Sequence, residues 1–399
     1  MRLSSTSSLP ATVQTPAYDR TARMSGIVHL GTGAFHKAHQ AVYTDDALAE
    51  GGDWMITGVS LRSGDVAEAL NPQDGLYPLI VRGQEGTFAR VIGSIARVLV
   101  APREPEAVMA ALTAPETKIV SLTITEKGYG VDPKTGGLDR AHPPIAPDLA
   151  NPRQPPGAGG YLVGGLRLRG GGRGAAFTAL CCDNLPHNGK VLKRLVSEFA
   201  AAVDADLGRW ITANVTFPST MVDRITPAST ETTFADALRL TGCDDRAAVE
   251  TEPFTQWVIE DDFVAGRPRW EAGGAIFARD VAPYEKMKLR MLNGAHSMLA
   301  YSGYIAGHAY VRDVMKDADL AGLVARQMDA AARTLEPVPG VDLAVYKADL
   351  LARFANPAIA HQTYQIAMDG TQKLPQRLVE PAIATLRAGG SLDAYAFAV

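Results

Sequence analysis

The polar residues of this chain whose types and spacing best suit catalysis are Lys288, Asn293 and His296, within the segment YEKMKLRMLNGAHSML. At about 100° per residue in an α-helix, Asn293 lies roughly 140° and His296 roughly 80° around the axis from Lys288, so the three side chains fall within one arc. The leucines between them predict a packed helix whose polar face is shielded from bulk water. The alternative is a solvated helix face, the ordinary place for Lys and His.

These three side chains suit hydride transfer from a secondary alcohol. A lysine that is desolvated among apolar neighbours has a lowered pKa, which makes it a suitable base for the hydroxyl proton. An amide such as that of Asn293 is a preorganised donor for the alkoxide that develops. Glu285 precedes Lys288 by one turn, and we expect it to relay the proton to solvent; an exposed acid at a helix start is the alternative.

A nucleotide-binding turn is predicted near the N-terminus, where the apolar run GIVHL leads into GTGAFH, residues 31–36. Glycines in such a turn let the backbone approach a pyrophosphate, and the following helix points free N–H groups at it. The first two glycines of the dinucleotide fingerprint are present, and His36 stands at the third position. A second short strand, 54–60, completes a βαβ unit of the usual size. The residues of the turn that we expect to bind a cofactor are Gly31, Gly33, Ala34 and Phe35.

The ribose end of this predicted site has two interpretations, because the second strand is followed by LRSGD rather than by an acidic residue. Asp65 would bind the ribose hydroxyls and favour NAD, whereas Arg62 would pair with a 2′-phosphate and favour NADP. A solvated turn is the alternative for both residues. Thr125 and Glu126 lie where the next buried strand ends, and we expect them at the edge of the cofactor crevice.

The order of elements predicts an α/β protein: a Rossmann-type doubly wound sheet followed by a mostly α-helical domain. Buried β-branched runs alternate with helical patterns in the first part, and periods near 3.6 dominate the rest. The predicted parts are a flexible leader (1–25), a dinucleotide-binding domain (26–283) and a helical substrate and catalytic domain (284–399). We expect the Gly- and Pro-rich stretch 130–174 to be a long loop, and 76–81 with 88–100 to form an inserted antiparallel piece.

The composition excludes several classes of protein. The 39 Lys+Arg against 43 Asp+Glu and the 46% of hydrophobic residues are typical of a globular protein, with no basic block that would indicate nucleic acid as a partner. Three cysteines without a Cys-x-x-Cys spacing indicate neither a disulfide scaffold nor a zinc site, so we expect no metal. No run approaches the roughly 18 apolar residues of a membrane span, and the first residues lack the apolar core of a secretory signal, which predicts a cytoplasmic protein.

Together these features resemble the mannitol dehydrogenase family of long-chain, zinc-independent polyol dehydrogenases, which also contains the fructuronate reductases (D-mannonate oxidoreductases). The Lys-x4-Asn-x2-His spacing is specific to this family. The matching segments, in order from residue 26 to about residue 378, are GIVHLGTGAFHKAHQAVYTDD, QDGLYPLI, LTITEKGY, CCDNLPHNG, FPSTMVDRITP, QWVIEDDF, KLRMLNGAHSMLAYSGYIAGH and QIAMDGTQKLPQRL. Several long matches in one order are not expected by chance.

The resemblance implies a role for individual residues. These roles are general base for Lys288, oxyanion hole for Asn184 and Asn293, substrate orientation for His296, and contact with substrate hydroxyls or a carboxylate for Asp223 and Lys373. A turn-capping Asp and a surface Lys are the alternatives for the last two. The resemblance also implies NAD, or NADP, as cofactor, a sugar acid or polyol as the small-molecule partner, and a monomer or small homo-oligomer.

Two features depart from the pattern of the family. Gln365 occupies a position where mannitol-specific members carry Arg, and QIAMDGTQKLPQR is closer to the fructuronate reductase branch. We therefore count Gln365 among the substrate contacts and favour D-mannonate and D-fructuronate over mannitol and fructose. The apolar helical pattern of 392–399 has no stop signal, whereas relatives continue through further helices, so a truncated chain is expected. A nucleotide-binding protein without catalysis is the second hypothesis.

Overall fold

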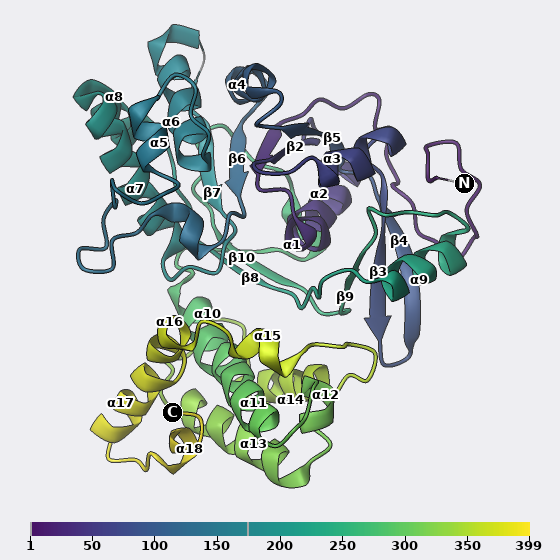
Figure 1. Ribbon diagram of the computed structural model, residues 1–399, viewed down its shortest axis with the longest axis vertical. Coiled ribbons are helices and arrows are strands. Elements are labelled where there is room, and N and C mark those ends of the chain that lie inside the picture. Colours follow the sequence, from purple (N-terminus) through teal and green to yellow (C-terminus); the bar gives the residue numbers. More distant parts are fainter. Residues whose placement is uncertain (1, 174) are drawn as a thin grey trace. The chain divides into compact units, whose positions relative to one another are not determined.

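The computed structural model describes residues 2–173 and 175–399 of the chain. Residues 1 and 174, the first of the expected leader and the last of the expected loop, lie outside this part. The chain forms two compact units (Figure 1). The first unit contains the residues up to Val81 with Thr87–Thr251 and Thr255–Arg279, and the second contains Arg82–Gly86, Glu252–Phe254 and Asp280–Val399.

A five-stranded parallel sheet forms the centre of the first unit, in the order β5-β2-β1-β6-β7. Its strands are β1 (Ile27–Leu30), β2 (Ile56–Ser60), β5 (Ile95–Val100), β6 (Ile119–Leu122) and β7 (Thr178–Cys181). Every residue of β1, β2, β6 and β7 is buried, as in sheets covered on both faces. The strand order reverses beside β1, so the carboxyl ends of β1 and β6 meet at a topological switch point. The predicted doubly wound fold is confirmed.

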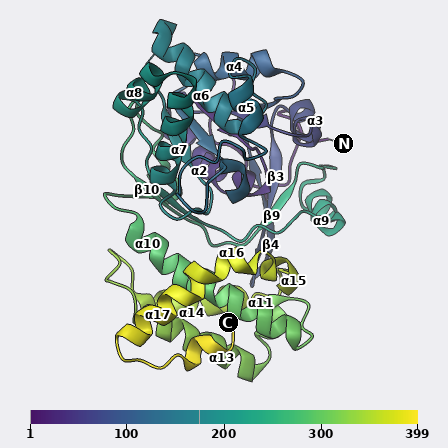
Figure 2. The same ribbon diagram turned by 60° about the vertical axis from the view of Figure 1, so that its left-hand side comes forward.

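Helices cover both faces of this sheet, and alternate side chains of β1 point to the two faces (Figure 1, Figure 2). Val28 and Leu30 pack with apolar residues of α4, α6 and α7, whereas Ile27 packs with those of α1 and α2. The helices of the first unit are α1 (Ala34–Ala38), α2 (Gln40–Ala49), α3 (Asp65–Leu70), α4 (Pro105–Thr113), α5 (Ala146–Ala150), α6 (Ala158–Leu168), α7 (Asn188–Val203), α8 (Ala205–Asn214) and α9 (Glu231–Thr241).

Two smaller sheets accompany the central one. One has the order β4-β3-β9 and consists of β3 (Tyr77–Gly83), β4 (Gly86–Ile92) and β9 (Val249–Thr251). The other has the order β11-β10-β8 and consists of β8 (Thr220–Asp223), β10 (Gln256–Glu260) and β11 (Ile276–Ala278). The expected antiparallel piece is therefore wrong for 95–100, because β5 joins the central sheet parallel to β2. An alternating strand pattern does not specify which neighbour the strand pairs with.

The second unit is helical. Its helices are α10 (Ala282–Met287), the π-helix η5 (Lys288–Asn293), α11 (Gly294–Ile305), α12 (Val311–Val314), α13 (Ala318–Ala332), α14 (Leu343–Phe354), α15 (Thr363–Ala367), α16 (Gly370–Leu374), the π-helix η6 (Pro375–Val379), α17 (Glu380–Arg387) and α18 (Asp393–Ala396). The Asp317 and Asp342 carboxylates accept N–H groups of the first turns of α13 and α14, which caps these helices. α11 packs against α13 and α15 at the centre of the unit.

The stretch 130–174 is not a long loop over its described length, because α5, α6 and a π-helical turn (Arg169–Arg173) form within it. The Asp148 carboxylate accepts the N–H groups of Gly157 and Gly160, 2.7 and 2.9 Å away, at the start of α6. A Cβ atom at Gly165 would lie 3.0 Å from Leu112 of α4. The glycines that indicated a loop therefore allow close packing between two helices.

The described part of the expected leader also packs on the first unit. Leu3 and Val13 are 1% and 8% exposed, and they contact a small apolar cluster that includes Ile80. Gln14 forms a parallel β-bridge with Arg90 of β4. The expectation of a flexible leader rested on polar composition, and the few apolar residues in it provide this anchoring.

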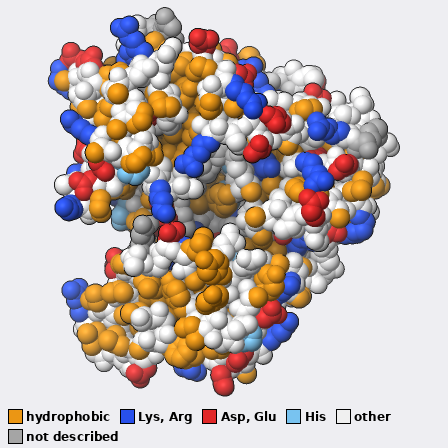
Figure 3. Space-filling model, viewed as in Figure 1, with side chains coloured by type: hydrophobic (Ala, Val, Ile, Leu, Met, Phe, Trp, Pro, Cys, Tyr) orange, Lys and Arg blue, Asp and Glu red, His pale blue; other side chains and the backbone are white. Residues whose placement is uncertain are grey.

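The surface carries mixed charge. Figure 3 shows Lys and Arg interspersed with Asp and Glu over the visible face of both units, and hydrophobic side chains that gather over the helical unit. Exposed apolar residues near the end of the chain include Leu386, Phe397 and Val399. Among the described helices, none combines the length and apolar character that crossing a bilayer requires.

Candidate active site

The glycine turn follows β1 directly and bends the chain over the end of the central sheet. Gly31 has φ +94°, a region that L side chains rarely adopt, and a Cβ atom there would lie 2.2 Å from the Thr123 carbonyl oxygen. The Gly31 and Thr32 N–H groups donate to the Val59 carbonyl, which joins the turn to β2. A Cβ at Gly33 would meet nothing closer than 3.8 Å. Glycine is thus required at position 31 by the backbone conformation of the turn, whereas no described atom crowds the position of a Cβ at Gly33.

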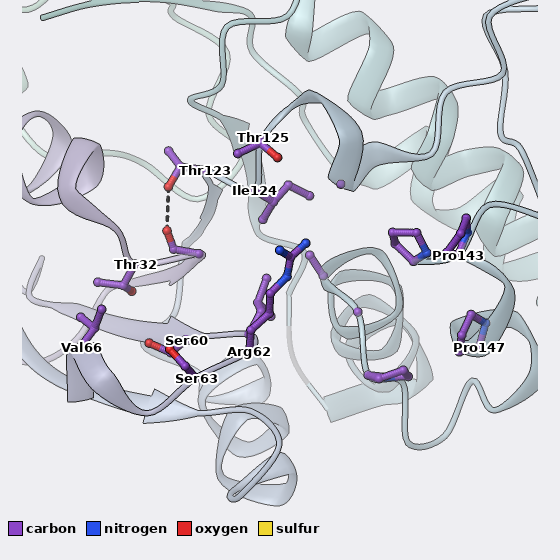
Figure 4. Close-up of a pocket in the computed structure, with 17 residues that line it drawn as sticks. Thr32, Ser60, Arg62, Ser63, Val66, Thr123, Ile124, Thr125, Pro143 and Pro147 are labelled. Carbon is purple, nitrogen blue, oxygen red and sulfur yellow. Dashed lines mark hydrogen bonds between the residues drawn. The ribbon is translucent and has the colours of Figure 1, made fainter. Parts of the chain in front are cut away.

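A cavity of about 550 Å³ lies beside this turn, at the carboxyl ends of β1, β2 and β6 (Figure 4). It is lined by Gly31, Thr32, Ser60, Leu61, Arg62, Ser63, Val66, Thr123, Ile124, Thr125, Gly128, Pro143, Pro144, Pro147, Pro156, Gly157 and Ala158. The hydroxyl oxygens of Thr32 and Ser60 are buried and have no hydrogen-bond partner in the described residues. Buried hydroxyls without partners are groups that a bound ligand can satisfy. The cavity therefore fits an adenine dinucleotide at the switch point of the sheet.

The predicted cofactor residues fall into two groups. Gly31, Arg62 and Thr125 line the cavity. The other predicted residues lie around it without lining it, and they are Gly33, Ala34, Phe35, Asp65 and Glu126. The sequence pattern placed these side chains near the carboxyl edge of the sheet but could not give their directions.

Phe35 and Asp65 have partners inside the first unit. The Phe35 ring stacks on His39 with ring centroids 5.0 Å apart. The Asp65 carboxylate accepts a hydrogen bond of 3.0 Å from the Ser63 hydroxyl in the first turn of α3. These contacts turn both side chains toward neighbours in the protein.

Asp183, which follows β7 and precedes Asn184, holds one wall of the cavity and was missed by the sequence reasoning. Its carboxylate accepts from the N–H groups of Ile124 (2.7 Å) and Thr125 (3.1 Å) and from the Tyr129 hydroxyl (2.6 Å). Burial raises the pKa of this carboxyl, and the hydrogen bonds from Tyr129 and the two amides oppose that rise. Thr125 has φ +65°, an unfavourable value for Thr. The Asp183 carboxylate thus helps to maintain a strained loop at the cavity.

A buried histidine pair lies under the glycine turn. His29 is fully buried in β1, with its ring nitrogens 2.8 Å from the hydroxyls of Ser121 and Thr123. Thr123 in turn donates to the Gly31 carbonyl at 2.9 Å. The His36 ring stacks on His29 with centroids 3.5 Å apart. Burial lowers the pKa of His29 to about 3, so its imidazole is neutral. This neutral ring packs beneath the glycine turn and between the neighbouring strands.

Asn184 and Asp223 belong to the first unit, where Asn188 connects their segments. The Asn188 amide donates to the carbonyls of Cys181 (3.3 Å) and Thr220 (2.9 Å), and its oxygen accepts from the Thr220 N–H (2.9 Å). The end of β7 is thereby joined to the start of β8, the strand that ends at Asp223. Asn184 is exposed, whereas Asp223 is 3% exposed.

Lys288, Asn293 and His296 lie on one continuous helical segment of the second unit and are all buried, at 7%, 5% and 8% exposure. The segment is not α-helical throughout, because η5 is a π-helix from Lys288 to Asn293. Hydrogen bonds from i to i+5 bring residues five positions apart nearly above one another, so Lys288 and Asn293 lie closer to one face than α-helical spacing predicts. Short π-helical turns occur frequently at functional sites.

His296 is a neutral imidazole among positive groups. Its ring packs against Phe354 (centroids 4.7 Å apart) and His361 (5.3 Å), and its Nε2 has no partner in the described residues. Burial lowers the pKa of His296 well below its usual value, and the charges of His361, Arg353, Arg377 and Lys288 lower it further. All four charges act in the same direction, so His296 lies in a cationic neighbourhood.

The remaining predicted substrate and relay residues also belong to the second unit. Glu285 is half-buried in the first turn of α10, and Gln365 is exposed on α15, the helix that packs against α11. The Lys373 ammonium donates to the Met368 carbonyl at 2.6 Å. In the part of the chain that the structure describes, no cluster of His, Cys, Asp and Glu forms a metal site, and the three cysteines are free thiols.

Comparison with known families gives two matches that follow each other along the chain. Residues 25–272 match the mannitol dehydrogenase Rossmann domain, and residues 280–399 match the mannitol dehydrogenase C-terminal domain. Together these two matches cover most of the sequence.

Individual relatives agree with these matches. The chain is 47% identical over 391 residues to a D-mannonate oxidoreductase of Escherichia coli, covering 96% of this chain and 80% of the relative. It is 39% identical over 398 residues to a polyol:NADP oxidoreductase of Gluconobacter oxydans, covering 98% and 82%. The solved structure of Pseudomonas fluorescens mannitol 2-dehydrogenase, a ternary complex with NAD and D-mannitol, is similar with a TM-score of 0.93 and 41% identity, covering 100% of this chain and 82% of that one.

Proposed function

The chain belongs to the mannitol dehydrogenase family, and from this premise we propose that it is an NAD(P)-dependent oxidoreductase that interconverts D-mannonate and D-fructuronate. It is an oxidoreductase of the class that acts on a CH–OH group of a polyol or sugar acid. The choice of a hexonate within that class is the part that we propose. The 47% identity to a D-mannonate oxidoreductase supports it.

The observation that carries the substrate choice is the positive charge around His296. Arg377 is buried at 8% exposure, and its charge contributes to the field that lowers the pKa of the His296 imidazole. Arg353 also contributes, although Glu252 pairs with its guanidinium through two contacts of 2.7 and 2.9 Å. Buried cations favour an anionic ligand over a neutral one. The carboxylate of a hexonate satisfies this environment better than the terminal hydroxymethyl group of mannitol.

The cofactor would be held by the cavity at the switch point. The turn is open at Gly33, and the Thr32 and Ser60 hydroxyls have no hydrogen-bond partner among the residues that the structure describes, which fits a bound dinucleotide. When bound, the nicotinamide supplies the hydride acceptor for alcohol oxidation and the hydride donor for the reverse reaction. One relative is named for NADP and another is solved with NAD, so the family uses both cofactors.

We assign the proton and charge chemistry to this chain's own residues. Lys288, in its amine form, takes the proton from the substrate hydroxyl, and Glu285 passes it toward solvent one turn away. The amides of Asn184 and Asn293 donate to the oxygen on which negative charge develops. The neutral His296 imidazole offers a hydrogen bond that orients the substrate without adding another charge.

Replacing the proposed base tests this mechanism. We expect Lys288→Ala to lower kcat by about 10²- to 10⁴-fold, the usual contribution of a positioned general base, while nucleotide binding is retained. Lys286→Ala is the matched control, because Lys286 is an exposed lysine two residues away. Turnover of Lys288→Ala at the wild-type rate would rule out Lys288 as the base.

A substrate panel tests the hexonate. Oxidation or formation of reduced nicotinamide is followed by absorbance with each cofactor and with D-mannonate, D-fructuronate, mannitol or fructose, in the presence and absence of EDTA. We expect the highest kcat/KM with D-mannonate and D-fructuronate, unchanged by EDTA. A higher kcat/KM for mannitol and fructose would favour the second candidate, mannitol 2-dehydrogenase, which the similarity to the solved Pseudomonas enzyme supports. Nucleotide binding without turnover of any of the four compounds contradicts both candidates.

A further inference from the structure

His361 is a second histidine beside His296 in the helical unit, although the two residues are far apart in the chain. Its ring meets the His296 ring edge to face, with centroids 5.3 Å apart and an angle of 89° between the ring planes. Phe354 packs on the same His296 ring with centroids 4.7 Å apart. His296 therefore has an apolar neighbour in Phe354 and a polar one in His361, so a group that bonds to His296 is within reach of His361.

Backbone contacts fix the main chain at His361. Its carbonyl accepts the Val311 N–H at 3.0 Å, and the next residue, Gln362, forms an antiparallel bridge with Tyr310. The helix α15 begins directly afterwards, at Thr363. The ring itself is held less firmly, because no residue that the structure describes forms a hydrogen bond with it. The position of His361 is thus set by the backbone, while its side-chain torsions can still change.

Two ring nitrogens of this histidine pair lack hydrogen bonds. His296 Nε2 and His361 Nδ1 are both closed off from solvent, and neither has a partner among the described residues. Buried polar atoms are seldom left in this state, because burial removes their water without a replacement. His361 as a whole is half-buried, so a rotation of its side chain would admit a small polar group between the two rings. The pair therefore has the properties of a site for a polar group of a ligand.

The charge state of the pair suits a hydroxyl group. Both imidazoles are neutral at neutral pH, since burial lowers the pKa of His361 to about 4 and that of His296 well below its usual value. A neutral imidazole has one donor and one acceptor nitrogen, and a hydroxyl can both donate and accept, whereas a carboxylate only accepts. One oxygen can bond two nitrogens that lie up to about 6 Å apart, and rings with centroids 5.3 Å apart allow this.

We propose that His361 is a substrate-binding residue that, together with His296, holds one hydroxyl of the substrate chain. The inference rests on the proposed function, because it takes the substrate to bind at His296. It deepens that function by adding a residue that recognises the hydroxylated chain, which sugar acids and polyols share, whereas the charge of Arg377 favours a sugar acid. The contact serves binding and not proton transfer, so its loss should raise KM and leave kcat nearly unchanged.

Two replacements of His361 separate hydrogen bonding from packing. His361→Phe keeps an aromatic ring but has no polar atom, whereas His361→Asn loses the ring and keeps an amide near the place of Nδ1. KM and kcat are measured with whichever of the four panel compounds gives the highest kcat/KM. We expect His361→Phe to raise KM about 10- to 100-fold, the range for a buried polar group that loses its partner, with kcat within about twofold of wild type. His361→Asn should give a KM between those of wild type and His361→Phe.

His308→Phe is the matched control. His308 is a partly exposed histidine of the same unit, its Nε2 lies 3.8 Å from the Asp317 carboxylate, and the ring contacts of His296 do not include it. This variant should keep the wild-type KM, and nucleotide affinity should be unchanged in all three variants.

The outcomes separate the contact from the proposed function. A wild-type KM in His361→Phe would overturn the contact and leave the proposed function intact. A KM in His361→Asn no lower than that in His361→Phe would also overturn it, because packing of the ring would then account for the loss. A wild-type enzyme that turns over none of the four compounds would instead overturn the proposed function, and the role of His361 with it.

Discussion

The neutral histidine beneath the glycine turn makes the stability of the first unit depend on pH. His29 is fully buried and its pKa is lowered from 6.5 to about 3 by burial. In the unfolded chain the imidazole regains its ordinary pKa, so between these two values the unfolded state binds a proton that the folded state does not. The contribution of His29 is therefore favourable at neutral pH and is lost progressively as the pH falls below 6.5.

The size of this effect follows from the pKa difference. Each pH unit below the unfolded pKa costs about 1.4 kcal/mol for one such imidazole. Between pH of about 7.5 and 5.5 the wild type should therefore lose about 1.4 kcal/mol of unfolding free energy through His29 alone. His29→Gln removes this titration. It also loses ring hydrogen bonds to Ser121 and Thr123, but that loss is the same at both pH values.

Urea denaturation at the two pH values measures the effect. We expect the free-energy gap between wild type and His29→Gln to be about 1.4 kcal/mol smaller at the lower pH. His36→Gln should behave like His29→Gln, because burial also lowers the pKa of His36. A gap that is identical at both pH values for His29→Gln would refute the neutral, buried imidazole.

Three substitutions test the other contacts. Asp183→Asn should lower the free energy of unfolding by about 2 to 3 kcal/mol and weaken nucleotide binding, because an amide cannot accept from every group that the carboxylate does, including the Thr125 N–H. Urea denaturation measures the first effect and calorimetry the second. Unchanged values in both would contradict this role of Asp183. Gly31→Ala should reduce nucleotide affinity by at least about tenfold, since its Cβ collides with backbone; wild-type affinity would show that the turn adapts. Arg353→Met should lower the free energy of unfolding by about 3 to 5 kcal/mol, because it leaves the Glu252 carboxylate buried without its cation. Adding Glu252→Gln should recover part of this loss. If urea denaturation shows no recovery, the loss comes from packing of the Arg353 side chain and not from the ion pair.

Local sequence patterns were sufficient to predict the fold class and the family. The apolar runs around Ile27 and Ile119 read as buried strands because strands covered on both faces contain few polar residues. Gly31 signalled its turn because a positive φ next to a backbone carbonyl admits only glycine. The Lys-x4-Asn-x2-His spacing pointed to one helical face and to the mannitol dehydrogenase family. Each of these signals is carried by residues that are close together in the chain.

The features that sequence reasoning missed depend on partners distant in the chain. The bonds from Asp183 to the amides of Ile124 and Thr125 span almost sixty residues, and only the pairing of β6 with β7 brings these groups together. α6 was mistaken for loop because its glycines serve packing against α4, which local propensity does not include.

What the sequence by itself determined was therefore the sheet, the glycine turn and the set of candidate catalytic side chains. What only the tertiary structure decided was the surroundings of each side chain. Burial and neighbouring cations make His296 neutral, and the absence of an acid from the described lining leaves Arg62 as the charge of the cavity. Both properties are sums over groups that folding assembles from separate segments, because desolvation and electrostatic fields depend on distance in space and not on position in the chain.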